Sequence, residues 1–222
     1  GALTALTLYF LQEEKAALVV IQRLIDGPDV WLSGLARLFR AQFAENAGDV
    51  DRVRADLAAA LECFGRVGDR WGLATALPMR ALLRQYDGDL DGALDDLREA
   101  RARAGEFGSL SLTDEIFIDM RWVDLHMRRG DGARAVAMLD GARERALRSA
   151  SPELIILVNA LEAGVWVRIG ELDRARQLVE LAEAQIGQEV PFGGDHGQAL
   201  VSSVRAALCL RQGDAAGADV AL

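Results

Sequence analysis

The chain has 222 residues, of which 51% are hydrophobic and 27% are charged, and this globular balance excludes wholesale disorder. The formal net charge of −9 gives an acidic surface that repels phosphate backbones, so we expect no direct nucleic-acid binding by this segment. No apolar run reaches the roughly 18 residues of a membrane span, and the first residues lack a basic signal-peptide region, which predicts a cytoplasmic protein with no membrane partner.

A glycine followed by an acidic residue recurs along the chain, in steps of 40, 42, 40 and 43 residues. The five pairs are Gly48-Asp49, Gly88-Asp89, Gly130-Asp131, Gly170-Glu171 and Gly213-Asp214. Equal spacing of one turn signal indicates one structural unit repeated along the chain.

Small and apolar residues stand at fixed distances from each of these turn glycines. They are Val53, Ala93, Ala135, Ala175 and Ala218 five residues after it; Leu57, Leu97, Leu139 and Val179 nine after; Ala60, Ala100, Ala142 and Ala182 twelve after; and Ala41, Ala81, Val123, Ala163 and Ala206 seven before. Offsets of 5, 9 and 12 fall on one stripe of a helix, and small residues there let a neighbouring helix approach closely. Each unit is therefore predicted as a helix A, a tight turn at the glycine, and a helix B.

Taken in chain order, these signals predict nine helices. They lie near residues 31–47, 50–64, 71–87, 90–104, 113–129, 132–147, 152–169, 172–186 and 197–211. Gly65, Gly105 and Gly187 are expected to end three of the B helices in the left-handed conformation, whereas Leu147 at the same position requires a different ending. Pro78 is expected to kink its helix or delay its start.

The predicted fold class is all-α, with a single helical-repeat domain over residues 1–222 and partial units at 1–30 and 212–222. A solenoid needs terminal units with a polar outer face, but the first residues are largely apolar. We therefore expect this chain to be part of a longer protein. The alternative is a natural end covered by dimerisation, which leaves homo-oligomerisation open.

The run Gly88-Asp89-Leu90-Asp91-Gly92-Ala93, followed by Leu97 and Ala100, resembles the tetratricopeptide repeat. That resemblance implies a right-handed superhelix of antiparallel helix pairs that binds a partner and is not an enzyme. The chain departs from the repeat in its period of about 40 residues, in place of 34, and in its terminal proline, which is replaced by Gly or Leu. It also lacks the usual tryptophan eleven residues before the glycine, where it has Arg37, Leu77, Asp119, Asn159 and Ser202.

Three further stretches, residues 68–74, 80–86 and 114–122, are similar to the repeat region of large actinobacterial transcriptional regulators of the antibiotic-regulatory and maltose-regulator-like ATPase types. In such regulators the repeats are thought to sense a ligand or partner and to restrain attached DNA-binding and NTPase domains. This segment contains none of the motifs of those two domains. The resemblance implies a sensor or scaffold role with a protein, a peptide or a small-molecule effector as partner.

Helix A lines the inner groove of such stacks, and its side chains six, three and ten residues before the turn glycine are expected to point inward. The candidate binding residues are Leu38, Gln42, Glu45, Leu82, Gln85, Met120, Asp124 and Met127. The competing interpretation is that these positions are buried between neighbouring helices. The four tryptophans, Trp31, Trp71, Trp122 and Trp166, are interpreted as packing residues.

No cofactor and no metal site are predicted. His126 is interpreted as a packing residue, and His196 as part of the irregular stretch 191–197, without a nucleophile beside it. Two other functions stay open, a freestanding adaptor or chaperone module and a small-molecule receptor with a pocket between helices.

Overall fold

The computed structural model describes residues 14–106, 112–186 and 194–221. Within these ranges the chain forms eleven helices and no strand, which confirms the all-α prediction. They are α2 (Glu14–Ile25), α3 (Val30–Asn46), α4 (Val50–Val67), α5 (Arg70–Tyr86), α6 (Leu90–Glu106), α7 (Leu112–Arg128), α8 (Gly132–Ser149), α9 (Pro152–Ile169), α10 (Leu172–Ile186), α11 (Gly194–Arg211) and α12 (Ala215–Ala221). None of the described helices is long and apolar enough to cross a membrane.

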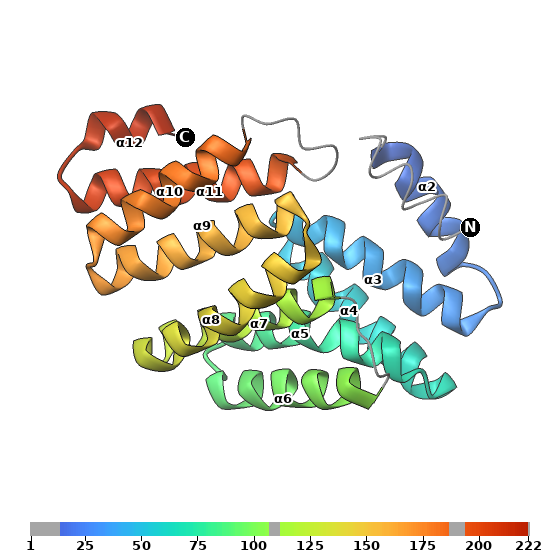
Figure 1. The fold of residues 1–222 in the computed structure, drawn as a ribbon. Helices are drawn as coiled ribbons and strands as arrows, with labels where there is room; N and C mark the ends of the chain where they lie inside the picture. Colours follow the sequence, from blue (N-terminus) through green and yellow to red (C-terminus); the bar gives the residue numbers. More distant parts are fainter. Residues whose placement is uncertain (1–13, 107–111, 187–193, 222) are drawn as a thin grey trace. The chain divides into compact units, whose positions relative to one another are not determined.

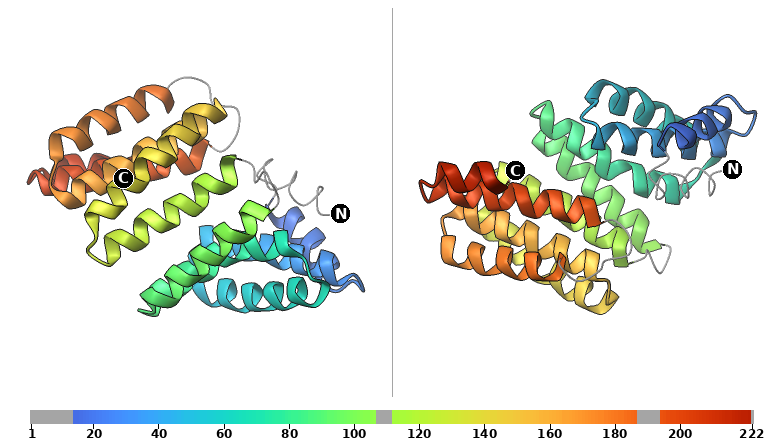
Figure 2. Two further views of the ribbon diagram at one scale, coloured as in Figure 1. Left: turned by 60° about the horizontal axis from the view of Figure 1, so that its bottom comes forward. Right: turned by 90° about the horizontal axis from the view of Figure 1, so that it is seen from above.

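The helices divide into two compact units, residues 1–110 and 111–222. Unit 1 contains α2 and the pairs α3/α4 and α5/α6, and unit 2 contains the pairs α7/α8, α9/α10 and α11/α12 (Figure 1). The partners of each pair run side by side in further views as well (Figure 2). The predicted helix pairs are thus present, whereas the superhelix and the single domain over 1–222 stay predictions.

The two helices of each pair are joined at the turn glycine, which takes the left-handed conformation, with φ between 74° and 101° at the five positions. At the first turn the Gly48 amide donates to the Glu45 carbonyl, at 3.1 Å, and the Asp49 amide donates to the Ala44 carbonyl, at 2.8 Å. This pattern satisfies the last carbonyls of helix A. The Asp49 carboxylate then accepts from the Arg52 amide, at 3.0 Å, and so caps helix B.

The predicted packing stripe is confirmed at every position. All residues five, nine and twelve after the turn glycine, and all those seven before it, are at most 5% exposed. The alanines among them leave room for the neighbouring helix, and the leucines and valines fill the core. The clusters they form join α3, α4 and α5 in unit 1, and α9, α10 and α11 in unit 2.

Several predicted helix ends were wrong. α4 continues through Gly65 and ends at Val67, with Gly68 in the left-handed conformation, and α6 runs to Glu106, past Gly105. Gly187 lies outside the described residues. As expected, α8 ends differently, because Ala150 takes the left-handed conformation with φ 52°. α5 begins at Arg70 and continues through the buried Pro78, so the proline does not delay its start.

One aromatic side chain ties three helices of unit 1 together. The ring of Phe64 on α4 is fully buried. A β-carbon added at Gly72 of α5 would lie 2.4 Å from a Phe64 ring carbon. One added at Gly34 of α3 would lie 2.8 Å from the β-carbon of Cys63 and 3.2 Å from another carbon of the Phe64 ring. Glycine at both places therefore lets α3 and α5 approach the ring.

We predict that Gly72→Ala destabilises unit 1, because the new methyl group overlaps a buried ring that is held on both sides. Overpacking of this kind costs about 1–3 kcal/mol, which outweighs the better helix propensity of alanine. The matched control is Gly65→Ala in α4, where an added β-carbon meets no atom within 4 Å, so this variant should gain about 0.5–1 kcal/mol. Urea denaturation followed by circular dichroism measures both, and equal midpoints for the two variants would contradict the prediction.

Candidate functional site

In unit 1 the predicted groove residues divide between surface and core. Gln42 is exposed, Glu45 is half-buried, and their side chains are joined by a long hydrogen bond of 3.5 Å. Leu38 is 4% exposed and belongs to the core cluster of α3, α4 and α5, and Leu82 is 6% exposed. The polar part of the predicted face in this unit is therefore the last two turns of α3.

Gln85 of α5 is buried, at 5% exposure, and neither polar atom of its amide has a hydrogen-bond partner in the described structure. Buried amides in proteins are normally paired, so this side chain is an unusual choice for its position. No pattern in the sequence distinguishes Gln85 from an exposed glutamine.

In unit 2 the predicted groove residues are all partly accessible. Met120 and Met127 of α7 are half-buried and pack against the clusters that α7 forms with α8 and α9. Asp124 lies between them and accepts from Arg128 of its own helix, at 2.8 Å, and from Arg168 of α9, at 3.4 Å. The structure therefore adds two arginines to the predicted face. Whether the eight residues bind a partner stays a prediction.

The two histidines belong to different helices, α7 and α11. His126 is buried in α7, at 6% exposure, in agreement with a packing role. The expectation of an irregular stretch around His196 was wrong in part, because α11 begins at Gly194 and includes this residue in its first turn. Residues 191–193 lie outside the described ranges. The described residues contain no group of three or more His, Cys, Asp or Glu side chains that could hold a metal ion.

Buried carboxylates are a second kind of candidate, because charged groups inside a protein often mark functional sites. In unit 1 Asp56 and Asp96 are each 2% exposed and stand eight residues after a turn glycine. Asp56 accepts two hydrogen bonds from Arg40, at 2.7 and 2.6 Å, and Asp96 accepts two from Arg80, at 2.9 and 2.7 Å. The hydrogen bond to Asp56 raises the pKa of the Arg40 guanidinium despite the opposing effect of burial.

Unit 2 has a different pairing at different positions. Asp119 is fully buried on helix α7 and accepts from Arg145 of α8. The repeat-equivalent residue of α9 is Asn159, which donates to Gln185 of α10, at 3.2 Å, and accepts from Arg143, at 3.3 Å. Asp119 and Asn159 both stand eleven residues before their turn glycine.

All these buried groups join the helices of a pair or of neighbouring pairs, and each has a partner of opposite charge or complementary polarity. We therefore interpret them as structural and not as catalytic groups. Sequence reasoning missed them, although Arg40 and Arg80, like Asp56 and Asp96, recur at the 40-residue period of the repeat.

We predict that Asp96→Ala destabilises unit 1 by about 2 kcal/mol, because it leaves the Arg80 guanidinium without its bidentate partner. The expected loss of stability is smaller than for a fully buried pair, since the Arg80 side chain is 36% exposed and water stabilises part of the unpaired guanidinium charge. The control is Asp95→Ala, one residue earlier, where both members of the Asp95–Arg98 pair are exposed and the cost should stay within about 0.5 kcal/mol. Thermal unfolding measures both, and a loss of the same size for Asp95→Ala would contradict this interpretation.

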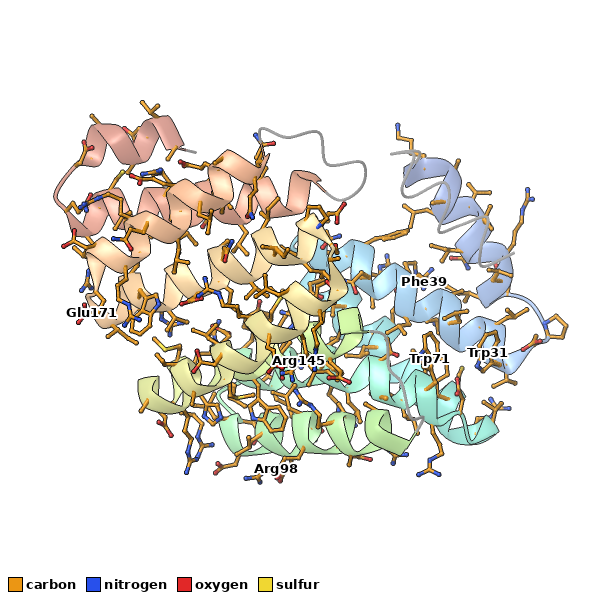
Figure 3. All side chains as sticks on the ribbon, viewed as in Figure 1. Trp31, Phe39, Trp71, Arg98, Arg145 and Glu171 are labelled. Atoms are coloured by element: carbon orange, nitrogen blue, oxygen red, sulfur yellow. The ribbon has the colours of Figure 1, made fainter. Side chains whose placement is uncertain are left out.

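Two of the four tryptophans are more exposed than expected of core residues. Trp31 and Trp71 are 38% and 36% exposed, whereas Trp166 is 8% exposed, as expected of a packing residue. Trp31 and Trp71 stand one repeat apart, and Figure 3 shows them next to each other at the first turns of α3 and α5. The Trp31 indole donates to the Asp69 carboxylate, at 2.6 Å, and Asp69 also caps α5.

No protein-family model, curated protein or solved structure matches this chain.

Proposed function

We propose that this chain binds a protein partner through the A-helix faces of its repeats, as a sensor or scaffold segment of a larger transcriptional regulator. The observation that carries the proposal is a contrast between two sets of repeat positions. The positions five, nine and twelve residues after the turn glycine and seven before it form a constant frame, because they hold only Ala, Leu or Val and are buried in every repeat. Three residues before the turn glycine, by contrast, the chemistry changes from repeat to repeat: Glu45, Gln85, Met127, Val167 and Leu210.

A constant frame with a variable face is what a scaffold needs, because the frame keeps the helix pairs in register while the face is free to match a partner. At that position Gln85 and Val167 are buried, at 5% and 4% exposure, whereas Glu45 and Met127 are half-buried, so the variable face includes accessible polar and apolar surface. The face also carries Asp124 with Arg128 and Arg168. Apolar area next to fixed charges suits a peptide segment better than a nucleic acid, which the net charge of −9 repels.

The regulatory part of the proposal rests on the resemblance of residues 68–74, 80–86 and 114–122 to actinobacterial regulators. In this view the protein works in the cytoplasm, and binding of the partner shifts the curvature of the repeat stack. The shift biases the DNA-binding and NTPase domains that are attached to the repeat stack. Such a bias requires that the partner binds one curvature of the stack more tightly than the other.

The binding role predicts where a partner can be captured. A photo-crosslinking amino acid placed at Gln42 or Met127, on A helices, should give a covalent adduct with a partner protein in the cells that produce this chain. The same amino acid at Ala58 or Ala137, exposed positions of B helices, is the matched control and should give none. Immunoblots score the adducts, and equal adducts at all four positions would contradict a partner-binding A-helix face.

The regulatory role predicts the size of the native protein. An antibody against this segment should detect a band several times larger than 24.0 kDa in a lysate of the source cells. A band near 24.0 kDa would exclude attached domains and favour a freestanding adaptor, while the crosslinking result would decide independently whether the repeats bind a protein.

A further inference from the structure

A row of arginines marks the last turn of each A helix in unit 2. Arg128 on α7, Arg168 on α9 and Arg211 on α11 all stand two residues before a turn glycine. The C-terminal end of a helix carries a partial negative charge, so arginine is stable there without any other partner. Three equivalent arginines therefore stand on successive A helices of this unit.

The first step of this row is bridged by an acid of the chain itself. Asp124, six residues before its turn glycine, accepts from Arg128 one turn later, at 2.8 Å, and from Arg168 of the next A helix, at 3.4 Å. One carboxylate thus joins two consecutive arginines of the row.

The second step has the arginines but not the acid. The repeat-equivalent of Asp124 in α9 is Gly164, again six residues before its turn glycine, so the second step lacks the equivalent carboxylate. Arg211 extends to the end of α9, where its Nη2 atom is 3.9 Å from the place of a β-carbon at Gly170. Within the described residues Arg211 has no ion pair.

We propose that Arg168 and Arg211, beside Gly164, bind a carboxylate side chain of a partner peptide in the place that Asp124 occupies between Arg128 and Arg168. Gly164 leaves the space for it, because a β-carbon there would meet only Val204, at an ordinary contact distance of 3.5 Å. The inference rests on the proposed function and specifies the partner's chemistry.

Apolar surface next to the arginines defines the second element of this chemistry. Ile169 follows Arg168 directly in the sequence and is 43% exposed. A partner segment that places an aspartate or glutamate between the arginines therefore gains by carrying an aliphatic side chain beside it, which removes apolar area from water. The ligand is a peptide with acidic and aliphatic residues in close succession.

The test uses the whole chain and a fluorescein-labelled peptide. In this peptide glutamate recurs every third residue, and so does leucine. Binding is followed by fluorescence anisotropy at low ionic strength. Gly164→Asp supplies the missing acid from within the protein. It should weaken peptide binding about tenfold, because the peptide carboxylate then loses its ion pairs with both arginines. The thermal stability of the protein should not fall. Gly164→Asn has nearly the same shape and no charge, and it should bind as the natural chain does.

Arg211→Ala should weaken the same peptide about threefold to fivefold, whereas Arg176→Ala on the B helix α10 should leave binding unchanged. A peptide with glutamine in place of glutamate should bind the natural chain more weakly than the glutamate peptide does, and it should not distinguish the natural chain from the Gly164→Asp variant. Equal weakening by Gly164→Asp and Gly164→Asn would show that bulk and not charge decides, and would overturn the site. Free glutarate that competes as well as the peptide at equal concentration would overturn the peptide as its ligand.

Failure of this inference and failure of the proposed function are distinguishable. If Gly164→Asp leaves peptide binding unchanged while the crosslinker at Met127 still captures a partner, the carboxylate site is wrong and the binding function stands. If no partner is captured but the peptide behaves as described, the site stands and the proposed function is wrong.

Discussion

The fold depends on one local arrangement, a left-handed glycine followed at once by an acidic residue. The glycine lets the chain turn, because its φ of about 70–100° is costly for residues with a β-carbon. The amide of the following residue satisfies a carbonyl at the end of helix A, and at four of the five turns its carboxylate caps helix B. The end of helix A therefore fixes the start of helix B. Because this start keeps the same distance from the stripe positions in every repeat, the packing stripe can be buried in all of them.

The two units build on the same turn with different buried polar pairs. Unit 1 uses a bidentate Arg–Asp pair in each of its two repeats, from the residue eight before the glycine to the residue eight after it. Unit 2 places Asp119 and Asn159 eleven residues before the glycine and pairs them with the B helix. A polar group buried at one depth of the helix pair is satisfied only when its partner is at the same depth. We infer that these pairs fix the register of each helix pair, while the alanine and leucine stripe supplies most of the apolar burial.

Sequence reasoning predicted the repeat well because glycine turns and small-residue stripes are local patterns with a single physical meaning. It placed the end of α4 at Gly65, three residues too early, because two glycines were available and only Gly68 takes the left-handed conformation. It did not anticipate the partial exposure of Trp31 and Trp71, since residue type reveals little about which face of a helix is covered. It could not anticipate the bridge from Asp124 to Arg168, whose 44-residue separation becomes a contact only once the third and fourth repeats are stacked.

The ring of Phe64, held between Gly34 and Gly72, has a consequence for how unit 1 can evolve or be re-engineered. Repeat proteins usually tolerate the deletion, duplication or exchange of single repeats, because each repeat interacts only with its nearest neighbours through similar surfaces. Here the ring belongs to one repeat and half of its cavity belongs to the next. A shuffled array would carry over either the ring without its second glycine or the glycine without its ring, so these two repeats are expected to be inherited, and to unfold, as an indivisible pair.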